Sequence, residues 1–277
     1  QILEDYDLAS MGFMSAEAIH VMVEAKRLAF EDRARFYADP DFSSTDLQAL
    51  ISEDYADTRR ALISMDQAME SVTHGDPAIL EEGDTTYLTV ADGNGMMVSL
   101  IQSNFRGMGS GLVPDGLGFM LQDRGELFSL DPDHPNVYAP GKRPFHTIIP
   151  AMVTQGDEAY MSFGLMGGAM QPQGHVQIIT NIIDFGLNVQ EAGDAARWRH
   201  SGSTSETGAA GETAGLGVIN VESGVPQSVR EALEALGHVV EEGDGGFGGY
   251  QAIRRDPETG VLFGASEMRK DGAAQGY

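Results

Sequence analysis

A β-hairpin pattern that begins at Thr85 constrains the fold of this chain more than any other feature. Residues 85–92 (TTYLTVAD) alternate polar and apolar side chains, and DGNG at 92–95 is a hairpin turn signal. Residues 96–102 (MMVSLIQ) then supply a partner strand that we expect to be buried. Two strands joined by so short a turn run antiparallel. The chain therefore contains an antiparallel sheet and is not built from helices alone.

Helical patterns precede and follow this hairpin. The spacing predicts one helix over residues 15–37, capped by Ser15, and weaker helical stretches through Met69. Periodicity, caps and turns also predict the later elements. We expect strands at 146–154 and 159–166 and a closing hairpin at 250–255 and 261–266. We expect helices near 172–185, from Asn188, and from Pro226 to Gly237. Helices, strands, helices and strands in this order predict an α+β fold, with helices layered on a mostly antiparallel sheet.

Composition excludes several classes of function. The 277 residues carry 17 basic and 42 acidic side chains, a net charge of −25, so we expect no nucleic-acid partner. No run approaches ~18 apolar residues, so we expect no membrane insertion. Because the sequence lacks cysteine, it has no disulfide, Cys-ligated metal or Cys nucleophile. The compartment stays open: the cytoplasm is slightly favoured, with the periplasm or secretion as alternatives, because the true N-terminus is not seen.

A candidate nucleophile stands at the head of the predicted hairpin. A threonine hydroxyl needs a base beside it, and cleavage of the Asp84–Thr85 bond would give Thr85 a free α-amine with an ordinary pKa of ~8. That amine can accept the hydroxyl proton directly or through one water molecule. By itself the motif is weak, because Asp-Thr-Thr far more often only starts a strand.

A pair of glycines is the second candidate. Gly167 and Gly168 follow the apolar strand 161–166 and precede a predicted helix. Backbone N–H groups at such a junction point outward with helix-dipole character, and glycine lets a substrate approach closely. The pair is suited to an oxyanion hole for a tetrahedral intermediate, and a simple tight turn is an equal alternative.

Other motifs fail on inspection. Asp131-Pro132-Asp133 begins like a calcium loop, but Asn136 and Lys142 occupy the positions that need Gly and Glu. The stretch GDGGFGGY lacks the Lys-Ser/Thr of a phosphate loop and is interpreted as a glycine-rich loop. We therefore expect no metal and no cofactor.

Six stretches taken together carry a family resemblance. They are TTYLTVADGNG, GMGSG, PGKRPFHTIIPAMV, GLMGGAMQPQ, DFGLNVQEAGDAARWRH and FGASEMRKDGAAQGY. In order and spacing they resemble the small subunit of the gamma-glutamyltransferase family, threonine-type members of the N-terminal-nucleophile (Ntn) hydrolases. The segment AEAIHVMVEAKRLAFEDRARFYADPDF resembles the C-terminal part of the family's large subunit. The resemblance implies a four-layer αββα sandwich, with residues 1–84 as a helical tail of the large subunit and 85–277 as the small catalytic subunit.

The same resemblance implies roles for individual residues. Family precursors cleave themselves before the first Thr of a Thr-Thr pair, here Thr85, and the freed Thr attacks a gamma-glutamyl amide. Thr85 then corresponds to the nucleophile and Gly167-Gly168 to the oxyanion hole. Ser103 corresponds to a second hydroxyl near the nucleophile, and Asn104 falls within one position of a substrate-contacting Asn. The expected mature form is a heterodimer of the two cleavage products, completed by an N-terminal half of the large subunit that this sequence lacks.

Three positions depart from the family's gamma-glutamyl enzymes. A Ser-Ser pair that holds the substrate carboxylate is replaced by His146-Thr147. An Asp-Asp-Phe whose second Asp holds the substrate amine is replaced by Glu126-Leu127-Phe128, and Arg124 stands where a neutral amide is usual. An Arg beside a missing carboxylate repels an ammonium group and attracts an anion. We therefore expect a dicarboxylic or oxoacid monoamide, or an acyl group without the α-amine, as in the family's acylase and amidohydrolase branch.

Three interpretations of function remain open at this point. The first is a self-processing amide hydrolase or acyltransferase that uses Thr85 on a small-molecule amide. The second is a true gamma-glutamyltransferase of glutathione metabolism, which a comparison of glutathione with an amide lacking the α-amine would distinguish. The third is a non-catalytic or incomplete acidic subunit that needs an N-terminal partner chain.

Overall fold

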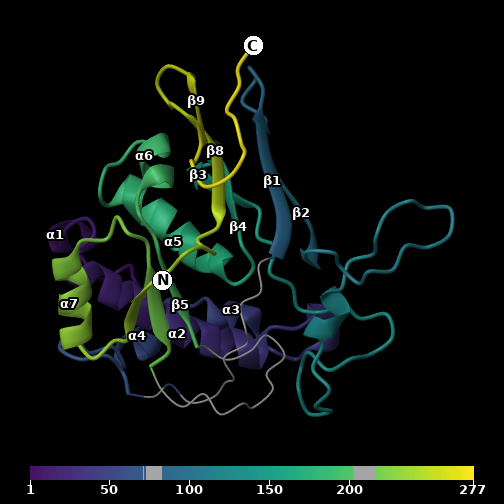
Figure 1. Cartoon of the computed structure of the whole chain (residues 1–277), viewed down its shortest axis with the longest axis horizontal. Coiled ribbons are helices and arrows are strands. Elements are labelled where there is room, and N and C mark those ends of the chain that lie inside the picture. The colour runs from purple at the N-terminus through teal and green to yellow at the C-terminus, as the bar shows by residue number, and fades with distance from the viewer. Residues whose placement is uncertain (71, 73–82, 203–215) are drawn as a thin grey trace. The chain divides into compact units, whose positions relative to one another are not determined.

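Two compact units make up the chain. The computed structural model describes residues 1–70, 72, 83–202 and 216–277 (Figure 1). Unit 1 comprises Gln1–Ile79, Arg124–His146 and Trp198–Asp244, and unit 2 comprises Leu80–Asp123, Thr147–Arg197 and Gly245–Tyr277. Helices and sheets occur in both units; the sheets of unit 2 are antiparallel and the sheet of unit 1 is mixed, so the predicted α+β class is confirmed. The division at residues 84 and 85 concerns a cleavage site and stays a prediction.

Unit 2 contains two antiparallel sheets and two helices. The hairpin strands are β1 (Gly83–Ala91) and β2 (Met97–Arg106). The second sheet has the order β3-β4-β8-β9, formed by Ala151–Gln155, Glu158–Met166, Gly249–Arg255 and Leu262–Ser266. The helices are α5 (Met170–Ile183) and α6 (Val189–Asp194), and Asn188 and Glu191 form the capping box expected at the start of α6. The predicted strands at 85–92, 159–166, 250–255 and 261–266 are confirmed within one or two residues.

The elements of unit 2 stack as sheet, sheet and helix. The ribbon of β1 and β2 packs on the β4 and β8 side of the four-stranded sheet, and α5 and α6 contact the same sheet through β4, β8 and β9. Alternation along β4 separates the two faces: Phe163 and Leu165 join the buried core with Ile178 of α5, whereas Ser162 and Gly164 face β1. This layering holds the end of β4 between the hairpin and the start of α5.

Two sequence predictions about these strands are wrong. The strand expected over 146–154 begins only at Ala151, since Pro150 has no N–H to donate to a ladder. The strand at 96–102 was expected to be buried, but the residues that the structure describes do not cover both of its faces. Only the side of the ribbon that faces the second sheet is covered, and the outward side exposes Leu88, Val90, Val98 and Leu100 by 42–50%. We call these four residues the outer ribbon face; Leu88 pairs with Leu100 and Val90 with Val98.

Unit 1 is built around one long helix. Its helices are α1 (Leu8–Met11), α2 (Ala16–Phe36), α3 (Leu47–Leu50), α4 (Glu53–Arg60) and α7 (Gln227–Ala235), with short 3-10 turns at Pro40–Phe42 (η1) and Arg124–Leu127 (η2). Ser15 Oγ accepts the Ala18 N–H at 3.0 Å, as expected for the cap of α2. A small sheet of β5 (Trp198–Ser201), β6 (Val218–Val221) and β7 (Val240–Glu242) was not predicted, because strands of three or four residues leave almost no periodicity to detect. No helix within the described ranges combines the length and apolar character needed to cross a bilayer.

Candidate active site

The inner face of β1 contacts β4 in a regular register. Thr89 Oγ1 donates to Ser162 Oγ at 2.6 Å. Two residues earlier, the Tyr87 ring lies against Gly164, where a Cβ would overlap the ring atoms. A step of two residues back along β1 therefore corresponds to a step of two residues forward along β4. The two strands cross the interface between the sheets in opposite directions.

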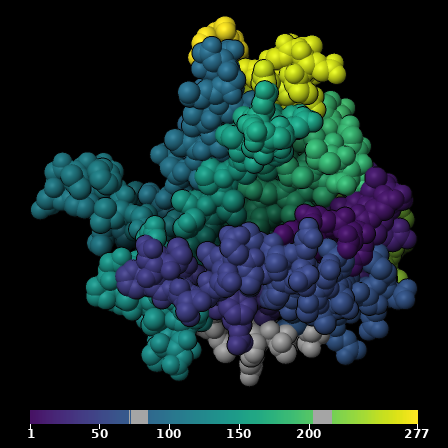
Figure 2. Space-filling view, turned by 180° about the vertical axis from the view of Figure 1, so that it is seen from behind, coloured from purple at the N-terminus to yellow at the C-terminus, as the bar shows by residue number. Residues whose placement is uncertain are grey.

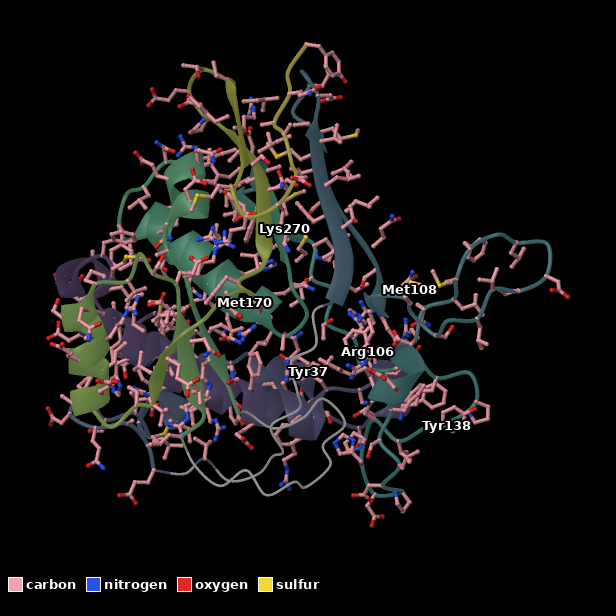
Figure 3. The ribbon with its side chains drawn as sticks, in the orientation of Figure 1. Tyr37, Arg106, Met108, Tyr138, Met170 and Lys270 are labelled. Atoms are coloured by element: carbon pink, nitrogen blue, oxygen red, sulfur yellow. The ribbon has the colours of Figure 1, made fainter. Side chains whose placement is uncertain are left out.

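The same register gives the level of the predicted nucleophile. One further step along β1 reaches Thr85, and the matching step along β4 reaches Met166, the last residue of the strand. Gly167 and Gly168 follow immediately, and α5 begins at Met170, which Figure 3 labels at the N-terminal end of that helix. Thr85 and the glycine pair therefore lie at the same end of the interface between the two sheets.

Thr85 is hydrogen-bonded to a second hydroxyl. Its side chain is nearly buried, and Oγ1 donates to Ser103 Oγ at 2.9 Å, since the two residues pair across β1 and β2. Ser103 Oγ also accepts the Phe105 N–H at 2.8 Å. A threonine hydroxyl with a fixed hydrogen-bond partner has a defined orientation. The structure thus brings together the two hydroxyl residues that the resemblance paired.

A β-bulge lies beside the predicted cleavage bond. The pairing register shifts between Gly83 and Thr85, so β2 has one extra residue at this point. Phe105 takes a positive φ of 78°, a left-handed conformation unfavourable for a bulky residue. Asn104, the neighbouring predicted substrate contact, accepts the Asp123 N–H through its backbone oxygen at 3.1 Å. Bulges of this kind re-aim side chains next to functional sites.

The glycine pair forms a turn with two unused backbone donors. Gly167 and Gly168 have φ values of 129° and 56°, which glycine tolerates best. Their carbonyl oxygens accept the N–H groups of Met170 and Gln171 at 3.0 and 3.1 Å, which starts α5. Within the described part of the chain, neither glycine N–H has an acceptor. Two free, partly exposed donors at a helix N-terminus suit an anion or a developing oxyanion.

Histidine chemistry is absent from this end of unit 2. His175 is the single histidine in the sequence ranges of unit 2, and burial lowers its pKa to about 4. Its Nε2 accepts the Leu165 N–H at 3.2 Å, so the neutral ring is occupied by the backbone. His175 is thus not placed to act as a base for Thr85, whereas a freed α-amine on Thr85 itself meets that need.

The remaining predicted substrate contacts are divided between the units. Arg124, Glu126 and His146 belong to unit 1, whereas Thr147 belongs to unit 2. Arg124 and Leu127 are 7% and 4% exposed, and Glu126 is exposed. Their roles in substrate binding stay predictions.

Sequence reasoning missed one neighbour of the glycine turn. A Cβ on Gly167 would lie 3.1 Å from Gly248 Cα, so Gly248 packs directly against the turn. The sequence predicts only a glycine-rich loop for the stretch that contains Gly248. The paired glycines were the one available signal, because close backbone approach requires residues without a side chain.

Comparison with known proteins identifies the family. The family model described as gamma-glutamyltranspeptidase matches residues 1–277. The chain belongs to the gamma-glutamyltranspeptidase family. The resemblance inferred from the six sequence stretches is thereby confirmed.

Three relatives illustrate the range of this family. The chain is 37% identical to the glutathione hydrolase-like YwrD proenzyme of Bacillus subtilis, covering 99% of this chain and 50% of the relative. It is 35% identical to the oxamate amidohydrolase proenzyme of Klebsiella pneumoniae, covering 95% of this chain and 48% of the relative. The crystal structure of cephalosporin acylase from Bacillus halodurans is 41% identical with a TM-score of 0.81, covering 100% of this chain and 49% of that one. The chain spans about half the length of the curated relatives that it matches.

Proposed function

We propose that this chain is the nucleophile-bearing part of a self-processing Ntn amide hydrolase or acyltransferase, cleaved between Asp84 and Thr85. The observation that supports it best is the Thr85 hydroxyl, bonded to Ser103 at the same end of the sheet interface as two free glycine N–H groups. That arrangement supplies a nucleophile and an oxyanion site. The relatives named as proenzymes support the processing step.

The chemistry follows from these groups. Once the Asp84–Thr85 bond is cut, the Oγ1 hydrogen turns from Ser103 Oγ to the α-amine of Thr85. The amine takes this proton, directly or through water, and Oγ1 attacks the amide carbon. The C=O electron pair moves onto oxygen, and the N–H groups of Gly167 and Gly168 stabilise this oxyanion. Collapse of the intermediate breaks the C–N bond, and the leaving amine takes the proton from the α-ammonium group. Water or an acceptor amine then cleaves the Thr85 ester by the same steps in reverse.

Ser103 has an orienting role in this scheme. Its Oγ accepts the hydrogen of Thr85 Oγ1 at 2.9 Å, which fixes the side-chain rotamer of the nucleophile. Orientation of this kind lowers the barrier because less rotational freedom is lost on reaction.

The substrate class rests on the departures in sequence. With Leu127 in place of a carboxylate and Arg124 nearby in the chain, we propose an amide whose acyl group lacks a free α-amine. The relatives named oxamate amidohydrolase and cephalosporin acylase are consistent with such a preference, whereas the glutathione hydrolase-like relative keeps a gamma-glutamyl donor as the alternative.

The proposed partner is further polypeptide of the large subunit. The outer ribbon face exposes two apolar cross-strand pairs, and exposed apolar surface of this kind marks interaction sites. The loop at 107–121, which stands out from unit 2 in the space-filling view (Figure 2), exposes further apolar side chains, namely Met108, Leu112, Val113, Leu117 and Phe119. Relatives twice the length of this chain contain additional polypeptide that could cover both surfaces. The mature form is then a heterodimer of the two cleavage products.

Intact mass and N-terminal sequencing of the purified full-length protein test the proposal. We expect a piece that begins Thr-Thr-Tyr-Leu in the wild type, no cleavage in Thr85→Ala, and partial cleavage and turnover in Thr85→Ser. Normal processing of Thr85→Ala would refute it. Turnover of glutaryl p-nitroanilide against gamma-glutamyl p-nitroanilide then tests the substrate class, and preference for the gamma-glutamyl compound would overturn our interpretation of Leu127. Failure to react with either donor would favour a non-catalytic subunit.

A further inference from the structure

The glycine turn is supported from behind by a loop with no room for side chains. Gly248 has a φ of 79°, and a Cβ there would overlap the Leu165 side chain and lie 2.5 Å from Met166 O. Gly167 meets Gly248 Cα from the other side, at 3.1 Å from its own ideal Cβ position. The backbones of Gly167 and Gly248 therefore pack against each other with no space for a side chain between them.

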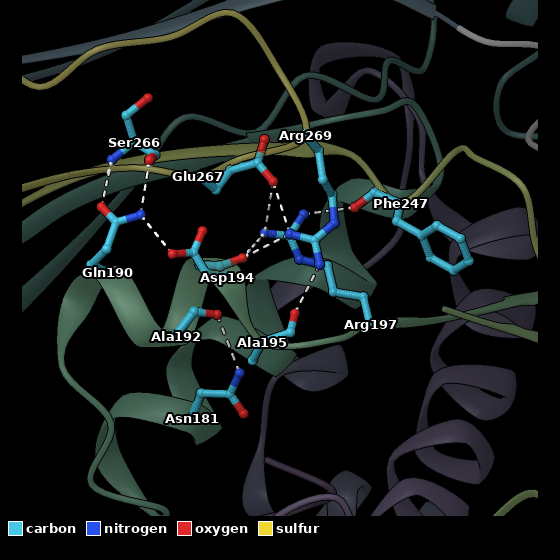
Figure 4. A network of polar contacts seen from close by, with 11 residues as sticks. Asn181, Gln190, Ala192, Asp194, Ala195, Arg197, Phe247, Ser266, Glu267 and Arg269 are labelled. Atoms are coloured by element: carbon cyan, nitrogen blue, oxygen red, sulfur yellow. Dashed lines mark hydrogen bonds and ion pairs between the residues drawn. The ribbon is translucent and has the colours of Figure 1, made fainter. Parts of the chain in front are cut away.

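A buried arginine binds this loop through a backbone carbonyl. Arg197 Nη1 donates to the Phe247 carbonyl at 2.8 Å, and Nη2 donates to the Gly193 carbonyl at 2.9 Å (Figure 4). Arg197 is 2% exposed and Phe247 is 4% exposed. The rigid guanidinium fork thus ties the residue before Gly248 to the C-terminal end of α6.

Two more charged residues complete a buried cluster. The Glu267 carboxylate lies 3.7 Å from Arg197 Nη2 and 2.9 Å from Arg269 Nη1. Arg269 also donates to the carbonyls of Gly193 and Ala195 at 2.8 and 2.9 Å. Arg269 therefore shares the carboxylate and the α6 carbonyl with Arg197, whereas the contact with the Phe247 carbonyl described above is made by Arg197.

Because of this difference, an effect on the geometry of the glycine turn can be distinguished from an effect on the stability of the fold. Buried ion clusters contribute little net stability, because the desolvation of the charges offsets their attraction. Both arginines belong to that cluster, and the contact of Arg197 with the Phe247 carbonyl leads to the oxyanion turn. An effect on catalysis beyond a general loss of stability is therefore expected of Arg197 and not of Arg269.

We propose that Arg197 is a positioning residue for the oxyanion turn. By holding the Phe247 carbonyl, it keeps Gly248 packed against Gly167, and this keeps the N–H groups of Gly167 and Gly168 pointing at the position of the oxyanion. The role rests on the proposed function, since it presupposes that these N–H groups bind an oxyanion. Loss of the contact lets the loop relax, and displacement of an oxyanion donor by about 1 Å costs on the order of 100-fold in rate.

The test compares Arg197→Lys and Arg197→Met with the matched control Arg269→Lys in the full-length, processed protein. Turnover of glutaryl p-nitroanilide and gamma-glutamyl p-nitroanilide is measured beside wild type and Thr85→Ala, together with the melting temperature of each variant. We expect kcat to fall about 10- to 100-fold in both Arg197 variants, with KM within about threefold of wild type. Arg269→Lys should keep kcat within about threefold, at a similar melting temperature.

Each possible outcome supports or overturns the positioning role of Arg197. Equal kcat losses in the Arg197 and Arg269 variants, or losses confined to KM, would overturn the positioning role while leaving the proposed function intact. Failure of both Arg197 variants to fold would overturn it too, since the role would then be purely structural. If wild type shows no turnover beyond that of Thr85→Ala, the proposed function fails and the positioning role falls with it.

Discussion

Acid should destabilise unit 2 through His175, and the structure gives the size of the effect. The ring lies between α5 and β4, against the Phe163 ring at 4.9 Å, and its Nε2 accepts the Leu165 N–H. Burial lowers its pKa from 6.5 to about 4. Below pH 6.5 the unfolded chain binds a proton at this residue that the folded protein does not accept until about pH 4. The stabilising contribution is therefore complete above pH 6.5 and is lost as the pH falls toward 4.

These pKa values predict a loss of about 2 kcal/mol in the free energy of unfolding between pH 7 and pH 5 from this residue. Urea unfolding of the full-length protein at the two pH values, for wild type and His175→Gln, measures it. Glutamine keeps an acceptor for the Leu165 N–H but does not titrate. Other buried histidines contribute equally to both proteins, so the difference between the two pH dependences isolates His175. An identical loss in His175→Gln and wild type would refute this reasoning.

Two further predictions concern the hairpin. Ser103→Ala removes the acceptor of Thr85 Oγ1, so kcat of the processed enzyme should fall about 10-fold or more with KM little changed. Steady-state kinetics will measure both constants, and an unchanged kcat would contradict the orienting role. Gly164→Ala introduces a Cβ into the space of the Tyr87 ring, which should separate the sheets, cost about 1–3 kcal/mol in unfolding free energy and reduce processing. Denaturation and intact mass will measure both effects, and a variant as stable and as fully processed as wild type would contradict the described packing.

Local signals explain what was predictable in the fold. Ser15 and Asn188 use their own side chains to satisfy backbone donors within three residues, so the sequence alone identified both helix starts. The turn at 92–95 likewise depends on the conformations of four consecutive residues. Each of these features is decided by neighbours in the chain, which is why pattern reasoning located it.

Features that depend on partners far away in the chain were missed. The three-stranded sheet of unit 1 pairs Trp198–Ser201 with Val218–Val221 and then Val240–Glu242 over strands too short to show a period. Exposure of the outer ribbon face could not be foreseen either, because an apolar side chain in an alternating strand does not reveal what covers it.

Residue order and spacing were sufficient to identify the family, the α+β class and the two candidate reactive groups. The level of Thr85 at the end of β4 and the bond of its hydroxyl to Ser103 are features of the three-dimensional structure alone. The tertiary structure alone revealed Arg197 and the Phe247 carbonyl behind the glycine turn. The physical reason is that these contacts join segments 18 to 80 or more residues apart, and their distances follow from sheet register and side-chain packing, which no local pattern encodes.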